Sequence, residues 1–270
     1  MTRVKRARAT HRPSLDAVLD ELAGLDRTDQ IRILKQLSRP QLRTLNNAWR
    51  YWAHPGQLAP PGAWRVWLIR AGRGFGKTRA GAEWVSAMAR AHPKARIALV
   101  GATEEDVRRV LIEGEAGLLS VAHGGERISY RRTDGVLEFH SGAVAAIFSA
   151  AAPEKLRGPE HQIAWCDELA KWRYGDAAWD NLMLGMRQGA DPRVVVTTTP
   201  RAVPLMQRVM GAAGTIETRG SSHDNPHLPE AFLEAIEAQY GGTRLGRQEI
   251  AGELIEDLDG ALWTRAMLDD

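Results

Sequence analysis

The chain has 270 residues, of which 44% are hydrophobic and 26% charged, as is usual for a globular protein. This length suits one large domain, or one domain with appendages. The single cysteine, Cys166, excludes an internal disulfide and fits a reducing compartment. No stretch reaches the roughly 18 apolar residues of a membrane-spanning helix. The formal net charge of +3 permits contact with nucleic acid without predicting it.

The N-terminal part of the chain is basic and then helical. Five lysines and arginines lie in the first 12 residues, and no apolar segment follows them, so they are not a secretory signal. They form either a solvated tail or a contact with DNA. Apolar residues then recur at helical spacing over 14–22, over about 31–37 before Pro40, and over 40–52. We therefore expect residues 1–53 to be a helical extension.

A glycine-rich loop follows the first apolar strand, which covers residues 64–69. Residues 70–78 read Arg-Ala-Gly-Arg-Gly-Phe-Gly-Lys-Thr, the sequence form of a phosphate-binding loop, although Ala71 stands where the general pattern has glycine. Backbone N–H groups of such a loop surround phosphates, Lys77 supplies a positive charge, and the Thr78 hydroxyl ligates Mg²⁺. The predicted nucleotide-binding residues of the loop are Gly72, Arg73, Gly74, Phe75, Gly76, Lys77 and Thr78.

Strands and helices alternate after the loop. The sequence predicts a helix over 78–90, a helix capped by Thr103, an antiparallel stretch over 128–149, and a helical end over 229–252 that is interrupted at residues 240–242. Further apolar strands are predicted over 96–101, 162–166, 193–198 and 215–218. This alternation indicates an α/β fold with a mainly parallel sheet that is flanked by helices on both faces.

Two acids end the predicted strand at residues 162–166. Asp167 is expected to hold the Mg²⁺ shell, and Glu168 to orient and polarise an attacking water. An apolar run that ends in an exposed acid pair is common by itself, but the pair lies about 90 residues after a Gly-Lys-Thr loop, which favours nucleotide hydrolysis. Cys166, beside the pair, is interpreted as a small core residue and not as a reactive thiol.

Three hydroxyl side chains, Thr197, Thr198 and Thr199, end the strand that begins with Arg193. Because ligands of open α/β sheets bind outside the carboxyl ends of the strands, these hydroxyls are candidates for a sensor of the γ-phosphate that couples hydrolysis to motion. The alternative is a strand that simply ends at the turn before Pro200.

Five motifs resemble the ATPase part of the terminase large subunits of tailed bacteriophages and gene transfer agents. They appear in the same order, at residues 73–84, 155–159, 165–172, 197–201 and 246–249. The resemblance covers about residues 49–263. It implies a P-loop NTPase of the additional-strand catalytic-glutamate type, with a core over 54–220 and a helical lid over 221–270.

The resemblance also assigns three further residues. Arg73 occupies the place of an arginine that these motors keep against the phosphates, so it is expected to be catalytic beside Glu168. Gln57, before the first strand, is expected to read the adenine, unless it is a surface turn residue. Arg157 is expected to reach the nucleotide of a neighbouring subunit as an arginine finger, unless it forms a structural salt bridge.

The expected activity is that of a Mg²⁺- and ATP-dependent motor that translocates double-stranded DNA into a capsid. A helicase-like or repair ATPase and a non-enzymatic assembly module are the alternatives. The resemblance implies as partners double-stranded DNA, the portal protein, the small terminase subunit and a ring of five copies, in the cytoplasm of a bacterial host. A nuclease domain, which whole large subunits carry, is not expected within this chain.

Overall fold

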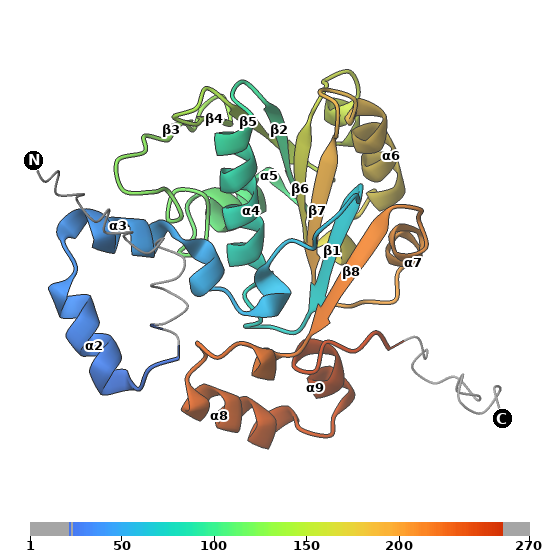
Figure 1. The fold of residues 1–270 in the computed structure, drawn as a ribbon. Coiled ribbons are helices and arrows are strands. Elements are labelled where there is room, and N and C mark those ends of the chain that lie inside the picture. The colour runs from blue at the N-terminus through green and yellow to red at the C-terminus, as the bar shows by residue number, and fades with distance from the viewer. Residues whose placement is uncertain (1–21, 23, 256–270) are drawn as a thin grey trace, which may run out of the picture. The chain divides into compact units, whose positions relative to one another are not determined.

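A computed structural model describes residue 22 and residues 24–255 (Figure 1). The chain divides into two compact units, residues 1–52 and residues 53–270. The helix expected over 14–22 lies outside the described residues apart from Leu22. No helix in the described part of the chain combines the length and the apolar character that crossing a bilayer requires.

Two helices make up the described part of the first unit. They are α2 (Arg27–Gln36) and α3 (Arg39–Asn47), followed by one 3₁₀ turn, η1 (Trp49–Tyr51). Helix α2 begins after Asp26, whose carboxylate accepts the backbone N–H groups of Thr28 at 2.8 Å and of Asp29 at 2.9 Å. Leu22 and Leu45 are buried between the helices, with apolar side chains of both packed around them.

Eight strands form one sheet in the second unit, in the order β3-β4-β5-β2-β6-β7-β1-β8. In chain order they are β1 (Val66–Ala71), β2 (Arg96–Gly101), β3 (Ser129–Arg131), β4 (Val136–Glu138), β5 (Val144–Ser149), β6 (Ile163–Asp167), β7 (Arg193–Thr198) and β8 (Thr215–Gly220). Strands β3, β4 and β5 pair antiparallel, and all other pairs are parallel. The predicted fold class, α/β with a mainly parallel sheet, is confirmed.

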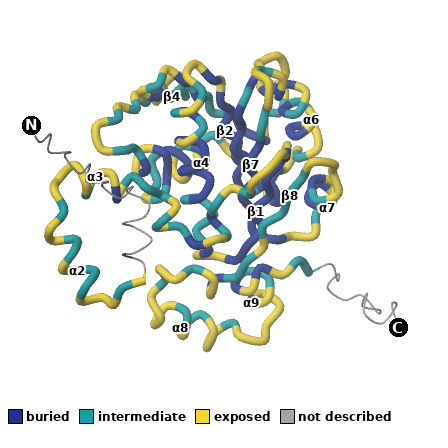
Figure 2. The backbone as a smooth tube through the Cα atoms, viewed as in Figure 1, coloured by how far each residue is buried: buried dark blue, intermediate teal, exposed yellow. Residues whose placement is uncertain are grey.

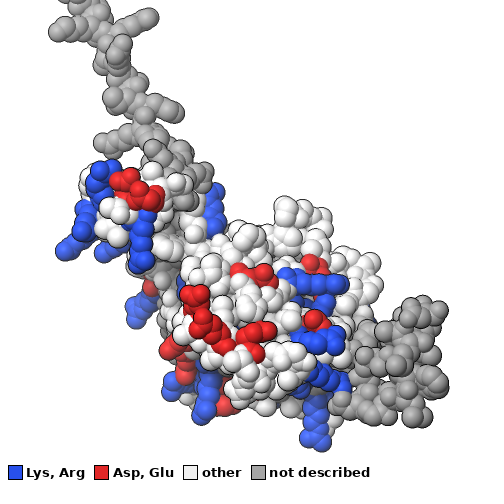
Figure 3. Space-filling model, turned by 90° about the horizontal axis from the view of Figure 1, so that it is seen from below, with Lys and Arg blue, Asp and Glu red and all other residues white. Residues whose placement is uncertain are grey.

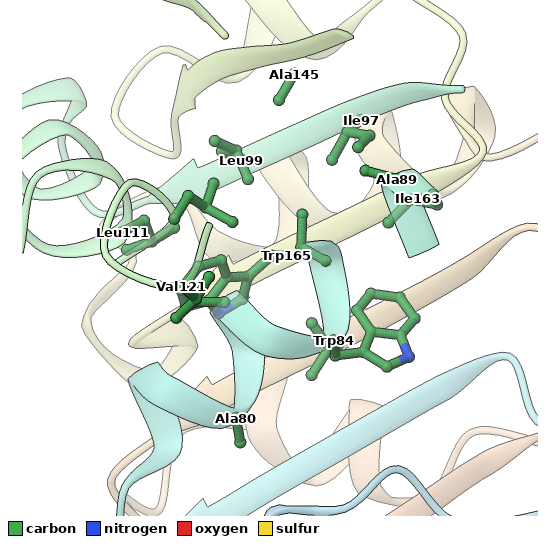
Figure 4. Close-up of a cluster of buried hydrophobic side chains, with 14 of the residues drawn as sticks. Ala80, Trp84, Ala89, Ile97, Leu99, Leu111, Val121, Ala145, Ile163 and Trp165 are labelled. Carbon is green, nitrogen blue, oxygen red and sulfur yellow. The ribbon is translucent and has the colours of Figure 1, made fainter. Parts of the chain in front are cut away.

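Helices cover both faces of the sheet. Successive side chains of a strand point to opposite faces, so each helix layer buries every second residue. On one face, Trp84 and Ala89 of α4 (Lys77–Ala91) pack on Leu99 and Trp165 (Figure 4). On the other, α6 (Gly175–Gly185) and α7 (Pro204–Met210) cover alternate residues such as Val196. Figure 2 shows the central strands buried along most of their length. Helices α6 and α7 were not predicted from the sequence.

Short helical segments complete the second unit. The helix that Thr103 caps is short, α5 (Glu104–Asp106), and continues as a π-helical turn, η3 (Val107–Ile112). The helical end is two helices, α8 (Glu230–Tyr240) and α9 (Arg244–Glu249), which lie at the end of the sheet toward which β8 runs (Figure 1). The remaining turns are η2 (Pro55–Gln57), η4 (Pro153–Leu156), η5 (Leu169–Lys171) and η6 (Ser222–Asp224).

Candidate nucleotide-binding site

The predicted phosphate-binding loop connects β1 to the N-terminus of α4. Gly74 and Gly76 have φ angles of 76° and 93°, which side chains disfavour. A Cβ atom on Gly76 would lie 2.2 Å from Nε2 of Gln57, so only glycine fits there. The loop therefore presents its backbone N–H groups together with the positive end of the α4 dipole, as an anion site requires.

Lys77 is the first residue of α4, and its side chain folds back over the loop. Its Nζ atom donates hydrogen bonds to the carbonyl oxygens of Ala71 and Gly72, each at 2.8 Å. Burial lowers the pKa of Lys77, and the negative charges of Glu168 and Asp167 oppose this shift. The ammonium group is thus held in place by the loop and faces both acids.

The acid pair lies at the end of β6, and β7 separates β6 from β1. Asp167 is 8% exposed, and its Oδ1 atom accepts a hydrogen bond of 2.6 Å from Oγ1 of Thr197. Burial raises the pKa of Asp167 to about 6, against the lowering effect of the Thr197 hydroxyl. Its carboxylate is therefore largely ionised at neutral pH, at a cost that a bound cation would relieve.

Glu168 adopts a backbone conformation that is rare for a residue with a side chain. Its φ and ψ angles are 48° and 46°, in the left-handed region, and its N–H group donates to the carbonyl oxygen of Thr197 at 2.6 Å. This turn brings the carboxylate to Oγ1 of Thr199, 3.4 Å away, and to Nζ of Lys171, 3.5 Å away. The left-handed turn thus places the carboxylate of Glu168 beside Thr199 and Lys171.

A cavity of about 390 Å³ brings the loop and Glu168 together, whereas Asp167, Gly72, Phe75 and Gln57 do not line it. The predicted residues that line it are Arg73, Gly74, Gly76, Lys77, Thr78, Glu168 and Thr199. Ala116, Arg79 and Lys171 also line the cavity, and no role was predicted for them from the sequence. Lys171 could have been identified by its position, three residues after Glu168.

The donor set of this cavity fits a small, hard cation. Thr78 and Glu168 line it with oxygen atoms, and the buried Asp167 lies beside Glu168. The described residues contain no group of three or more His, Cys, Asp or Glu side chains that could hold a metal. A hydroxyl and two neighbouring carboxylates suit Mg²⁺, because it is usually bound by one or two carboxylates together with phosphate oxygens and waters.

The three threonines at the end of β7 point to different partners. Thr197 accepts a hydrogen bond of 2.8 Å from Nε1 of Trp165 and donates to Asp167, whereas Thr199 contacts Glu168. The hydroxyl of Thr198 accepts the backbone N–H of Ala170 at 3.3 Å. Two of the hydroxyls thus hold the acid pair, and the third connects β7 to the turn that follows the pair.

Gln57 lies under the loop. It is 4% exposed, which rules out the alternative of a surface turn glutamine. Its Nε2 atom donates to the carbonyl oxygen of Gly76 at 3.1 Å, and its Oε1 atom accepts the N–H of His54 at 3.3 Å. Nε2 of His54 lies 2.9 Å from the carbonyl oxygen of Phe75, whose ring is buried. Gln57 and His54 thus hold the loop in place through the carbonyl oxygens of Gly76 and Phe75.

The C-terminal segment fastens the loop from its other side. The exposed side chain of Arg73 donates from Nε to Oε2 of Glu249 at 2.6 Å, and its backbone N–H donates to the carbonyl oxygen of Glu249, also at 2.6 Å. The hydrogen bond between the two side chains raises the pKa of Arg73. Ser222 donates to the carbonyl oxygen of Arg73 at 2.5 Å, and Asn225 to that of Gly74 at 2.6 Å. The sequence motif at residues 246–249 was the signal for this contact, but its role was not predicted.

Arg157 is not brought to the cavity of its own chain. Its side chain is 77% exposed, and the acid nearest to it is the equally exposed Glu154, at 3.8 Å. An exposed pair of this kind contributes about 0–1 kcal/mol to the free energy of unfolding, so a structural role for this salt bridge would stabilise the fold only weakly.

The loop, the acid pair on the strand beyond β7 and the parallel sheet define a P-loop nucleotide-binding protein. Residues 68–270 match the family model described as the N-terminal part of the terminase large subunit of the T4-like virus type. The match covers more than half of the chain, so the chain belongs to this family. Membership of this family agrees with the resemblance to terminases that the sequence motifs indicated, and not with the helicase-like alternative. A comparison with curated proteins gives no match.

Solved structures share the fold. The large terminase of a thermophilic bacteriophage, in complex with ADP, is 16% identical with a TM-score of 0.61, over 78% of this chain and 52% of that one. For the ATPase domain of the large terminase of Thermus phage P74-26 the values are 17% and 0.58, over 81% and 98%. For the HK97 bacteriophage large terminase they are 13% and 0.54, over 86% and 51%. The chain thus spans about half the length of the two whole large terminases.

Proposed function

We propose that the chain hydrolyses ATP with Mg²⁺ at the cavity between the loop and the acid pair. The observation that carries this proposal is that Lys77, Thr78 and Glu168 line one cavity, although 90 residues separate the first from the last. Family membership supports the same activity. The related large terminase of a thermophilic bacteriophage, which was solved with ADP, gives the chemical class of the ligand.

Each residue has a distinct task in this reaction. The loop N–H groups and Lys77 bind the outer phosphates, and Thr78 and Asp167 would hold Mg²⁺, which would supply positive charge to the phosphates. Glu168 orients a water and draws its proton while the water oxygen attacks the γ-phosphorus and the bond to the β–γ bridging oxygen breaks. Arg73, at the edge of the cavity, adds positive charge against the phosphates, and Thr197 and Thr199 couple the acids to β7.

The test is ATP turnover by the purified chain and by two variants. We expect Glu168→Gln to lower turnover by about 10²–10⁴-fold, the usual contribution of a general base, while nucleotide still binds. Lys77→Ala should abolish binding of a fluorescent ATP analogue. Glu160→Gln, at an exposed carboxylate that pairs with Arg187, is the matched control and should turn over ATP at the wild-type rate.

Full turnover by Glu168→Gln would remove Glu168 from the mechanism. Full turnover by Lys77→Ala would overturn the assignment of the loop. If the wild-type chain failed to hydrolyse ATP even with DNA and a portal protein present, the assembly module would replace the enzyme as the better account.

We further propose that hydrolysis drives double-stranded DNA into a capsid. The family membership supports this role, together with its partners: the portal protein, the small terminase subunit and other copies of the chain in a ring, which we propose to be pentameric. The site of action that follows is the portal vertex in the cytoplasm of a bacterial host. Stimulation of ATP turnover by a long DNA duplex, but not by an equal mass of free nucleotides, is the first check.

A further inference from the structure

The positive charge of the chain is concentrated in its first unit. Residues 1–52 contain 11 lysines and arginines and five aspartates and glutamates, whereas residues 53–270 contain 25 and 28. The small net charge of the whole chain therefore hides a basic unit joined to a slightly acidic one. A concentration of this kind marks a surface for a polyanion.

Six of these 11 basic residues lie in residues 24–52, five of them on α2 and α3. Six basic side chains of residues 24–52 are all exposed: Arg27, Arg32, Lys35, Arg39, Arg43 and Arg50. The stretch contains two acids, and both have local partners, since Asp26 caps α2 and Asp29 pairs with Arg32 at 2.8 Å. Within the described part of the chain, four of the six form no ion pair: Arg27, Lys35, Arg39 and Arg43.

The four cations are spread along both helices. Arg27 and Lys35 stand eight residues apart on α2, Arg39 and Arg43 stand one turn apart on α3, and Leu34 and Leu45 lie in the apolar contact between the helices. The four residues from Arg39 to Arg43 span about 6 Å along the axis. This is close to two steps of a nucleic-acid strand, at about 3.4 Å each. In Figure 3 lysines and arginines gather over this unit, with a few acids among them.

We propose that the exposed basic surface of α2 and α3 holds the phosphate backbone of double-stranded DNA without reading its sequence. The inference deepens the proposed function, on which it rests, by naming the surface that binds the duplex. Several exposed cations, each with a long flexible side chain, match a polymer of closely spaced phosphates.

The surface is unlike a protein-binding patch. Interfaces between proteins have an apolar or aromatic centre, even where arginine is enriched in them. Among the described residues of this unit, the large apolar side chains that are exposed are Ile31 at 44% and Trp52 at 42%. Two scattered side chains do not form an apolar centre, so the charge itself is the recognition element.

The test compares two variants of the full chain that lose the same charge. One carries Arg27→Gln, Lys35→Gln, Arg39→Gln and Arg43→Gln in the first unit. The control carries Arg65→Gln, Arg109→Gln, Arg127→Gln and Arg132→Gln, at exposed positions of the second unit that do not line the cavity. Fluorescence anisotropy measures binding to two labelled 30-base-pair duplexes of unrelated sequence, without nucleotide, over a range of salt concentrations.

We expect the first variant to bind both duplexes at least tenfold more weakly at about 0.1 M salt, with the slope of log K against log salt reduced by about 3.6, since each of the four lost phosphate contacts is worth about 0.9. The control should retain the affinity and the slope. Equal losses in both variants would mean that only net charge matters, and wild-type binding by the first would point to an acidic protein as the occupant; either result overturns the proposal.

The outcome is separate from that of the proposed ATPase. Turnover of ATP without DNA should be the same in the wild type and in both variants, and circular dichroism should show equal helix content. Loss of DNA binding in the first variant would support the surface even if no form of the chain hydrolysed ATP. Conversely, an active ATPase whose DNA binding ignores the four substitutions would contradict the surface alone.

Discussion

The hydroxyl of Thr197 donates a hydrogen bond of 2.6 Å to the carboxylate of Asp167 and accepts one from the indole of Trp165. Asp167 thereby keeps an ionised carboxylate in a buried place, with its pKa raised to about 6 by that burial. The folded chain binds the Asp167 proton more tightly than the unfolded chain, because the ordinary pKa is 3.8. The free energy of unfolding contributed by this group therefore falls as pH rises from about 4 to 6.

Asp167→Asn should remove this cost, since the amide is neutral and its oxygen still accepts from Thr197. At pH 7.5 we expect the free energy of unfolding in urea to rise by up to about 3 kcal/mol, for a pKa shift of about two units. The gain should vanish near pH 4. Exposed Asp191→Asn is the control. A variant destabilised equally at both pH values would show that the ionised carboxylate carries no cost, and Mg²⁺ should stabilise the wild type but not Asp167→Asn.

The left-handed backbone of Glu168 separates its catalytic role from its conformational cost. Glu168→Gly and Glu168→Ala both remove the carboxylate, so both should lose ATP turnover. Glycine accepts a φ of 48° freely, and alanine does not, so we expect the glycine variant to be more stable by about 1 kcal/mol.

At Glu234, inside α8, the same pair of substitutions provides the control. There the order should reverse, because alanine favours a helix interior by about 1 kcal/mol over glycine. Thermal unfolding measures both pairs. The same order at both positions would mean that the backbone of Glu168 is not strained.

The two hydrogen bonds of the Gln57 amide lead to a prediction about nucleotide selectivity. Because the amide holds the loop backbone, Gln57→Ala should weaken the binding of ATP and GTP by the same factor, of about fivefold to tenfold for hydrogen bonds of about 1 kcal/mol. Gln207→Ala, at an exposed position of α7, is the control. If the variant lost its preference for ATP over GTP, Gln57 would instead read the base, as the family resemblance implies.

The exposure of Arg157 makes its proposed role testable by dilution. If it completes the site of a neighbouring subunit, turnover per subunit should rise steeply with protein concentration in the wild type. Arg157→Ala should lower the maximal turnover by about 10³-fold or more, as the loss of an arginine finger does. Arg187→Ala, which also removes an exposed arginine, should behave as the wild type. A turnover per subunit that is independent of concentration would count against the finger.

The sequence allowed the sheet to be predicted closely. The bounds of β2 and β7 agree with the prediction, because each is a short apolar run with clear polar limits. Helix α7 was missed because it has only seven residues, too few to display a periodic pattern. Helix α6 was missed because apolar residues are spread around it and its first residue is Gly175. The π-helical turn after α5 has no signature in residue type.

The candidate site was predictable in its residues but not in its contacts. Gly-Lys-Thr and Asp-Glu identify themselves by residue type and order. In contrast, Glu249 meets Arg73 across 176 positions of the chain, and nothing in the residue types of either gives that distance. The left-handed turn at Glu168 was equally hidden, since sequence patterns assign such angles to glycine.

The attachment of the loop to residues 220–252 affects how the chain can be divided. Gly72 donates its N–H to the carbonyl oxygen of Gly220, and Arg73 depends on Glu249. A fragment cut after β8 would retain all eight strands and both acids but would lose the partners of Arg73. During synthesis Arg73 leaves the ribosome 176 residues before Glu249 does. The smallest fragment with a complete loop must therefore extend to about residue 252, well past the end of the sheet.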